Sequence, residues 1–234
     1  GFRINADAFE LVSEYLPLRI IRKHHHSVLQ MEALFYGLAG MITGDEDYPR
    51  ALAGEFNHLA QKYHLDPLQP GLIKFLRLRP SNFPTIRLSQ LCHLLHKQAD
   101  LFSLILEAEQ PADLYTVFNV QTSEYWETHF IFGKSSPGSP KNLGESSIRL
   151  LVLNLVIPFL YFYGSMKNQD RFREKAITFL ELEQGESNEI ITFWKSLGMP
   201  AGNALFTQAL LQLMQNYCNC KRCLECRIGL KLLQ

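Results

Sequence analysis

Hydrophobic residues recur at intervals of three and four along most of this chain, which is the spacing of helices with one buried face. The first such segment is interrupted at Pro17, and Ser27 can cap the next helix by accepting a backbone N–H. Pro84 is placed to open a later helix, because proline fits the first turn. The pattern predicts helices at residues 8–16, 28–40, 45–63, 72–78, 84–95, 101–108, 112–118, 148–163, 170–183, 186–197 and 200–217.

Few segments alternate as strands do, and candidate strands are confined to residues 120–122 and 129–132. Residues 133–144 read GKSSPGSPKNLG, a composition that predicts a flexible loop. We therefore expect a mainly α fold: a single multi-helix array with little or no sheet, forming one helical domain over residues 1–234. A division into two packed halves at the loop 133–144 is the alternative arrangement.

The most apolar segment, Ile148–Tyr163, bears on whether the chain meets a membrane. It is shorter than the roughly 20 residues that span a bilayer, and it contains Arg149, Asn154 and Pro158. We expect a buried core helix with a kink at Pro158 and no membrane contact. The mean hydropathy of the whole chain, −0.07, agrees with this expectation.

The overall charge is balanced, with 23 Lys and Arg residues against 23 Asp and Glu residues. That balance excludes the classes of protein that bind polymers through a strong global charge. Hydrophobic residues make up 47% of the chain, enough for a sizeable core. The charges are unevenly distributed, because residues 67–99 contain five Lys and Arg residues and no acid.

This acid-free segment contains a candidate anion or phosphate site. Lys74 and Arg77 are three apart and share a face of the helix expected there. The helix that Pro84 opens offers free backbone N–H groups beside the arginines. The candidate anion-binding residues are Lys74, Arg77, Arg79, Asn82, Thr85 and Arg87. Interhelical salt bridges with acid-rich segments such as 45–47 and 181–189 are the competing interpretation.

Four of the five cysteines lie within residues 218–226, and this cluster is a second candidate site. Four thiolates can bind a tetrahedral Zn²⁺, although typical zinc-binding pairs lie far apart in sequence. The candidate metal ligands are Cys218, Cys223 and Cys226, with Cys220 as an alternative fourth, and zinc is the candidate cofactor. A purely structural thiol cluster is the competing interpretation. Because a secreted disulfide framework would spread its cysteines, we expect a cytoplasmic protein.

Two further patterns are weaker candidates for a functional site. Gly133-Lys134-Ser135 lacks the earlier glycine that a P-loop needs, because Thr128 stands there. Glu127 and His129 would share one strand face as an acid/base pair, but no activated nucleophile accompanies them. We therefore expect this chain alone to have no enzymatic activity.

Three motifs carry a resemblance to a known family: LRLRPSNFPTIRLSQ at 76–90, YWETH at 125–129 and YCNCKRCLECRIG at 217–229. Over nearly its whole length the sequence resembles the C-terminal portion of a bacterial, Bacteroides-type protein family of unknown function. The cysteine pattern of that family matches Cys218, Cys223 and Cys226. Full-length members have an N-terminal half similar to restriction-endonuclease-type nucleases, so the resemblance implies a nuclease-like domain preceding this chain in the same protein. It carries over no catalytic or binding residue.

Together these observations favour a non-catalytic helical accessory module that binds nucleic acid or another phosphate or anion. The first alternative is a scaffold or protein-interaction domain without nucleic-acid binding, in which Arg77, Arg79 and Arg87 are buried in salt bridges. A weaker alternative is a metal-dependent enzyme that uses the C-terminal cysteine cluster.

Overall fold

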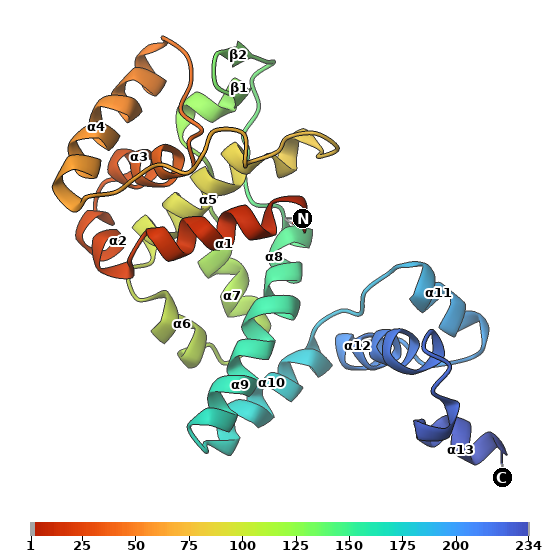
Figure 1. Ribbon diagram of the computed structural model, residues 1–234. Coiled ribbons are helices and arrows are strands. Elements are labelled where there is room, and N and C mark those ends of the chain that lie inside the picture. Colours follow the sequence, from red (N-terminus) through yellow and green to blue (C-terminus); the bar gives the residue numbers. More distant parts are fainter. Residues whose placement is uncertain (1–2, 234) are drawn as a thin grey trace. The chain divides into compact units, whose positions relative to one another are not determined.

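The computed structural model describes residues 3–233, which are mainly helical and contain one two-stranded sheet (Figure 1). The mainly α fold is therefore confirmed. The chain forms two compact units. Unit 1 comprises the residues up to Leu101 together with Val117–Gly144, and unit 2 comprises Phe102–Thr116 together with the residues from Glu145 onward. The loop 133–144 belongs to unit 1 and ends where the chain enters unit 2 again.

The described residues of unit 1 form five helices and a short hairpin. The helices are α1 Ala6–Tyr15, α2 Leu18–His24, α3 Val28–Leu38, α4 Asp47–Tyr63 and α5 Pro84–Lys97. The 3₁₀ turns are Arg3–Asn5, Pro80–Asn82 and Glu124–Glu127, and the antiparallel strands are β1 His129–Ile131 and β2 Lys134–Ser135. Ser27 caps α3 by accepting the backbone N–H of Gln30, as its position before the helix predicts.

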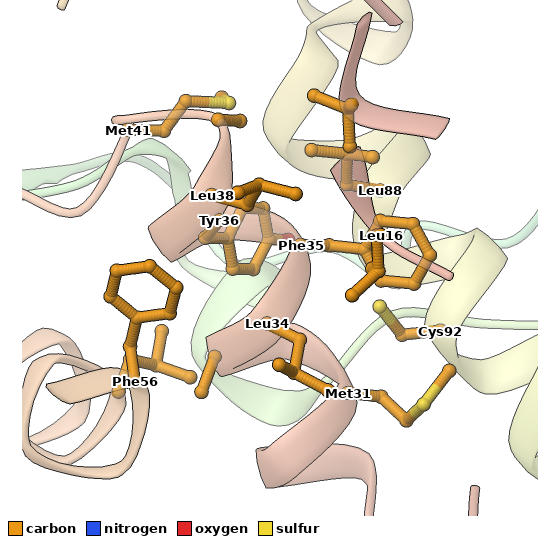
Figure 2. Close-up of a cluster of buried hydrophobic side chains, with 14 of the residues drawn as sticks. Leu16, Met31, Leu34, Phe35, Tyr36, Leu38, Met41, Phe56, Leu88 and Cys92 are labelled. Carbon is orange, nitrogen blue, oxygen red and sulfur yellow. The ribbon is translucent and has the colours of Figure 1, made fainter. Parts of the chain in front are cut away.

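Helix α3 is the centre of the unit 1 core, since every residue from Met31 to Leu38 is buried. It packs against α4 and α5, and Figure 2 shows its side chains among those of the surrounding helices. Gly37 is the point of closest approach: a Cβ there would lie 2.1 Å from Cγ of Phe56 on α4. Glycine is required in the middle of this helix because the Phe56 ring occupies the space of any side chain.

Unit 2 is assembled around the contact of two antiparallel neighbours, α9 and α10, with α12 packed on α10 and α11. Its helices are α8 Glu145–Leu151, α9 Ile157–Met166, α10 Asp170–Leu182, α11 Glu189–Ser196, α12 Ala204–Leu213 and α13 Arg227–Leu233. Most of α6 Leu101–Glu107 and α7 Pro111–Phe118 also belongs to it. Two π-helical turns, Val152–Val156 and Met214–Cys218, and the 3₁₀ turn Cys223–Glu225 complete the unit.

The apolar segment around Pro158 is longer than the sequence predicts. Helix α8, the π-helical turn and α9 form one continuous helix, Glu145–Met166, of 22 residues. The π turn ends at Val156, two residues before Pro158, and such a widened turn accommodates a residue that cannot donate a backbone hydrogen bond. The most apolar window of this 22-residue helix has a mean hydropathy of 1.6, and 39% of that window is buried. By length and composition alone the helix could cross a membrane. The core helix of a globular unit meets the same criteria.

Three local predictions differ from the structure. Residues 72–78 form no helix, and the backbone N–H and C=O of Lys74 bond instead to the distant side chain of Asn5. Residues 120–122 are not part of a strand; instead Val120 O accepts one bond from the Leu143 N–H. Helix α13 lies beyond the last helix that periodicity predicts, in a segment too short to show a clear repeat.

Candidate functional site

The candidate anion site centres on residues 74–79 of unit 1, here called the basic loop. Its base is fixed by Asn5, whose side chain is 2% exposed. Asn5 Nδ2 donates to Lys74 O and Asn5 Oδ1 accepts from Lys74 N, both at 2.8 Å. Phe75 packs edge-on against Phe83, with ring centroids 5.2 Å apart. The backbone of the basic loop is therefore held in place independently of its charged side chains.

The charged side chains of the basic loop face solvent. Lys74, Arg77 and Arg79 are all exposed. Among the residues that the structure describes, none of the ion pairs includes any of these three. Arg77 has a φ of 65°, a left-handed conformation that costs a non-glycine residue about 1 kcal/mol. The salt-bridge interpretation of these cations therefore finds no partner carboxylate in the described part of the chain.

The three remaining candidate residues are arranged differently. Arg87, in the first turns of α5, is half-buried and donates to Asn82 Oδ1 at 2.6 Å and to Gln90 Oε1 at 2.9 Å. Burial lowers the pKa of Arg87 from its ordinary value. Thr85 is buried, and its hydroxyl donates to Phe130 O. The structure thus pairs Arg87 with Asn82 and Gln90, and places Thr85 in the core.

A second group of polar residues lies inside unit 1 around Glu32 of α3, which is 1% exposed. Its carboxylate accepts three hydroxyl donors: Tyr48 Oη at 2.5 Å, Ser89 Oγ at 2.5 Å and Ser123 Oγ at 2.8 Å. Ser123 is also 3.0 Å from Nε2 of His93 on α5. This Glu32 network joins α3, α4, α5 and the segment before the turn Glu124–Glu127.

Burial dominates the electrostatics of the Glu32 network. Loss of solvent raises the pKa of Glu32 above 4.5, and the hydrogen bonds from Ser89, Tyr48 and Ser123 lower it in part. Burial and the charge of Glu32 raise the pKa of Tyr48, so its phenol remains a neutral donor. Three donors offset much of the desolvation cost of one carboxylate.

The order of groups in this network is not that of a nucleophilic triad. In a triad the imidazole lies between the hydroxyl and the carboxylate, so that it can remove the hydroxyl proton. Here Ser123 lies between His93 and Glu32, and its hydroxyl proton is directed to Glu32. The arrangement therefore orients His93 and stabilises the buried charge, and it supplies no activated nucleophile.

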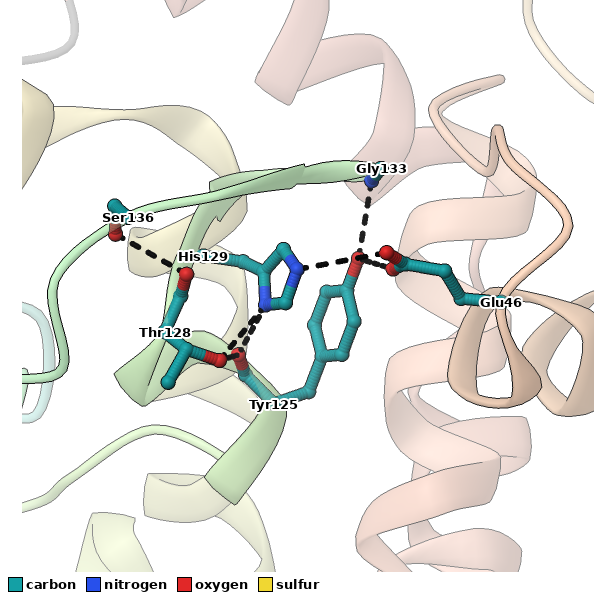
Figure 3. Close-up of polar contacts among 6 residues, drawn as sticks. All are labelled: Glu46, Tyr125, Thr128, His129, Gly133 and Ser136. Atoms are coloured by element: carbon teal, nitrogen blue, oxygen red, sulfur yellow. Dashed lines mark hydrogen bonds and ion pairs between the residues drawn. The ribbon is translucent and has the colours of Figure 1, made fainter.

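A third polar group, shown in Figure 3, joins the start of α4 to the hairpin. The Tyr125 ring is stacked on His129 at 4.0 Å and 6°, and its hydroxyl donates to Glu46 and accepts from the Gly133 N–H. Nδ1 of His129 is 3.0 Å from both Tyr125 O and Thr128 Oγ1, whereas its buried Nε2 is 3.6 Å from Glu46.

The contacts of this third group are structural and link the start of α4 to the hairpin. Partial burial raises the pKa of Tyr125 to about 12, and the bond to Glu46 adds to the rise. The phenol is thus a neutral donor at physiological pH. The carboxylate facing His129 comes from Glu46 and not from Glu127, whose backbone oxygen instead accepts a bond from Lys141. The sequence neighbour Glu127 therefore forms no acid/base pair with His129.

With this geometry established, comparison with known proteins places the chain in a family. Residues 1–189 match the model of a family described as protein of unknown function (DUF2851). The chain belongs to the DUF2851 family. No match was found among curated proteins or among solved structures. The match contains the basic loop, the Glu32 network and the third polar group, and it ends before the cysteine cluster.

The cysteine cluster lies in unit 2, beyond the DUF2851 match. Cys218, Cys220 and Cys223 are exposed, Cys226 is buried, and all are free thiols. Burial raises the pKa of the Cys218 thiol, and Cys226 and Cys223 add to that rise. Within residues 3–233 no three His, Cys, Asp or Glu side chains are grouped to hold a metal ion. The thiols as arranged do not fit a zinc site.

Sequence reasoning did not identify the Glu32 network, although one signal was present. Glu32 is the only charged residue in the apolar helix Val28–Leu38, and an isolated acid in a buried seam requires nearby donors. The donors themselves come from three other segments, with sequence separations of 16, 57 and 91 residues. Their convergence is a property of the tertiary fold and leaves no local pattern.

Proposed function

We propose that unit 1 of this DUF2851 protein binds nucleic acid through the phosphate groups, using the basic loop. The observation that carries the proposal is the set of three exposed cations, Lys74, Arg77 and Arg79, with no ion-pair partner among the described residues. Phosphate groups are the natural partners of such side chains, and arginine forms bidentate bonds to them.

Rigidity of the basic loop supports the proposal. The Asn5–Lys74 bonds and the Phe75–Phe83 contact hold the backbone, so that binding would have to order only the side chains. Ordering costs are a major part of the free energy lost on association. Arg87, held by Asn82 and Gln90, adds a fixed positive charge within the same acid-free segment, residues 67–99.

The test compares two double variants that remove equal charge. Arg77→Ala/Arg79→Ala changes the basic loop, and Arg19→Ala/Arg22→Ala changes two exposed arginines of α2. Affinity for labelled single-stranded and duplex oligonucleotides is measured over a range of salt concentrations. We expect the loop variant to reduce the slope of log affinity against log salt by about 2, because each lost phosphate contact removes about 1.

The α2 variant is the matched control and should leave the slope close to that of the wild type. Equal losses in the two variants would show that binding follows net charge alone, and would overturn the assignment to the basic loop. Absence of wild-type binding to both oligonucleotides at low salt would overturn nucleic-acid binding itself.

A further inference from the structure

Unit 1 contains a surface hollow of about 480 Å³ at the C-terminal end of α5, apart from the basic loop. Its volume is in the range of small-molecule sites. The lining residues are His93, His96, Lys97, Asn119, Val120, Gln121 and Asn142. They offer two imidazoles, one ammonium and three carboxamides, and no lining residue is an acid.

The Glu32 network determines which ring nitrogen of His93 is available to a ligand in this hollow. The Ser123 hydroxyl proton is directed to Glu32, so Ser123 Oγ can only accept a bond from His93, and Nε2 of His93 carries a proton. Nδ1 of His93 has no hydrogen-bond partner and is not among the buried unpaired atoms of the described residues. This nitrogen is therefore open to solvent at the hollow.

The two other basic groups are fixed in the same way. Nδ1 of His96 donates to His25 O at 2.6 Å, which leaves its Nε2 available. Nζ of Lys97 donates to Asn119 O at 3.4 Å and keeps two further protons for a ligand. Each basic side chain thus uses one hydrogen bond for orientation and retains another position for an occupant.

We propose that this hollow binds a small ligand bearing an oxyanion, phosphate or carboxylate, which the protonated imidazole of His93 holds together with His96 and Lys97. The lining lacks any group that would repel an anion, and the three carboxamides can orient the rest of the ligand. Glu32 lies behind Ser123, and its negative charge would favour the protonated imidazole of His93.

The electrostatics of the hollow agree with the proposal. Burial lowers the pKa of His93, and the neighbouring His96 lowers it further. An anion between these groups would reverse the second effect, so that binding takes up protons. Cations in the last turn of α5 also offset the helix dipole. That role by itself predicts no saturable ligand.

Sulfate is a suitable probe because it remains a dianion throughout the pH range in which histidine titrates. In the full chain, imidazole ¹H–¹⁵N signals of His93 and His96 are followed during sulfate addition, with chloride at equal ionic strength as the reference. We expect saturable signal shifts for both histidines and a rise in the pKa of His93. Affinity should fall by up to about tenfold per pH unit above the His93 pKa. Phosphate and succinate arms then distinguish phosphate from carboxylate preference.

Two double variants complete the test. His96→Gln/Lys97→Gln removes exposed cations of the hollow, and His58→Gln/Lys62→Gln removes an exposed matched pair on α4. We expect the first to weaken sulfate binding at least about tenfold, as loss of charge-assisted hydrogen bonds implies, and the second to have no effect. Equal behaviour of both, or no saturation of the wild type, would indicate an adventitious ion only and overturn the proposal. Arg77→Ala/Arg79→Ala should leave sulfate binding unchanged, which separates this site from the proposed nucleic-acid surface.

Discussion

Charged side chains of unit 1 occur in two contrasting environments, one buried and one exposed. The Glu32 carboxylate is buried and accepts three hydroxyl hydrogen bonds, whereas Arg77 and Arg79 are exposed and belong to none of the ion pairs within residues 3–233. An unpaired charge is costly inside a protein and nearly free at its surface. The degree to which a charge is satisfied therefore separates groups that hold the fold together from groups that remain available to a ligand.

Arg87 is intermediate between these two extremes. It belongs to the same acid-free segment as the basic loop, but its guanidinium is half-buried and bonded to Asn82 and Gln90. Gln90 in turn donates to Lys141 O, so the contact extends to the loop 133–144. The comparison thus predicts a graded effect on stability, with Glu32 first, Arg87 second and the basic-loop arginines last.

The largest effect is expected for Glu32→Ala. Three hydroxyls would each lose an acceptor at a cost of about 1–3 kcal/mol, partly offset by removal of a buried charge, so we expect a loss of about 3 kcal/mol in the free energy of unfolding. Urea denaturation measures this loss. Glu32→Gln keeps one acceptor oxygen and the side-chain volume, and should cost less than half as much. Equal small losses in both variants would show that the network is not needed for folding.

The pH dependence of the unfolding free energy is a second test of the role of Glu32. Its pKa is raised in the folded state above 4.5 by burial, so folding favours the protonated form. The contribution of Glu32 to stability is therefore fully present below pH 4.5 and is lost as the pH rises through the folded-state pKa. The difference in unfolding free energy between wild type and Glu32→Gln should shrink in that direction. A difference that is constant with pH, or that grows as the pH rises, would contradict the raised pKa.

Arg87 should show the intermediate effect. Arg87→Ala removes two charge-assisted hydrogen bonds from a half-buried site, and we expect a loss of about 1–2 kcal/mol in the free energy of unfolding. Arg87→Lys retains the charge but not the planar fork that reaches Asn82 and Gln90. It should therefore be destabilised nearly as much as Arg87→Ala. Wild-type stability of Arg87→Lys would show that charge matters here and geometry does not.

Sequence reasoning succeeded where local signals decide the structure. The cap at Ser27 and the proline at the start of α5 each mark a helix start within a few residues. It failed at residues 72–78, where the apolar spacing favours a helix but the chain is irregular, with a contact across 69 residues between Asn5 and Lys74. Non-local hydrogen bonds leave no periodic pattern, so such an override could not be foreseen.

The candidate sites also differ in whether local sequence or contacts between distant segments form them. The asymmetric charge of residues 67–99 pointed to exposed cations, because surface groups need no precise partner. The Glu32 network and the pairing of His129 with Glu46 depend on side chains brought together from separate elements. The cysteine cluster shows the converse: closeness in sequence did not produce a metal-binding geometry among the described residues.

The smallest effect is expected for Arg77→Ala/Arg79→Ala. Both side chains are exposed and take part in none of the ion pairs of the described residues, so the free energy of unfolding should change by no more than about 0.5 kcal/mol. Arg77→Gly is a useful companion, because glycine adopts the left-handed φ of 65° without strain and should be neutral or slightly stabilising. A loss above about 1 kcal/mol in the double variant would mean that these arginines support the fold, and the contrast with Glu32 would fail. A near-zero change in stability, combined with the reduced salt dependence of oligonucleotide binding, would show that the same two side chains matter to the ligand and not to the fold.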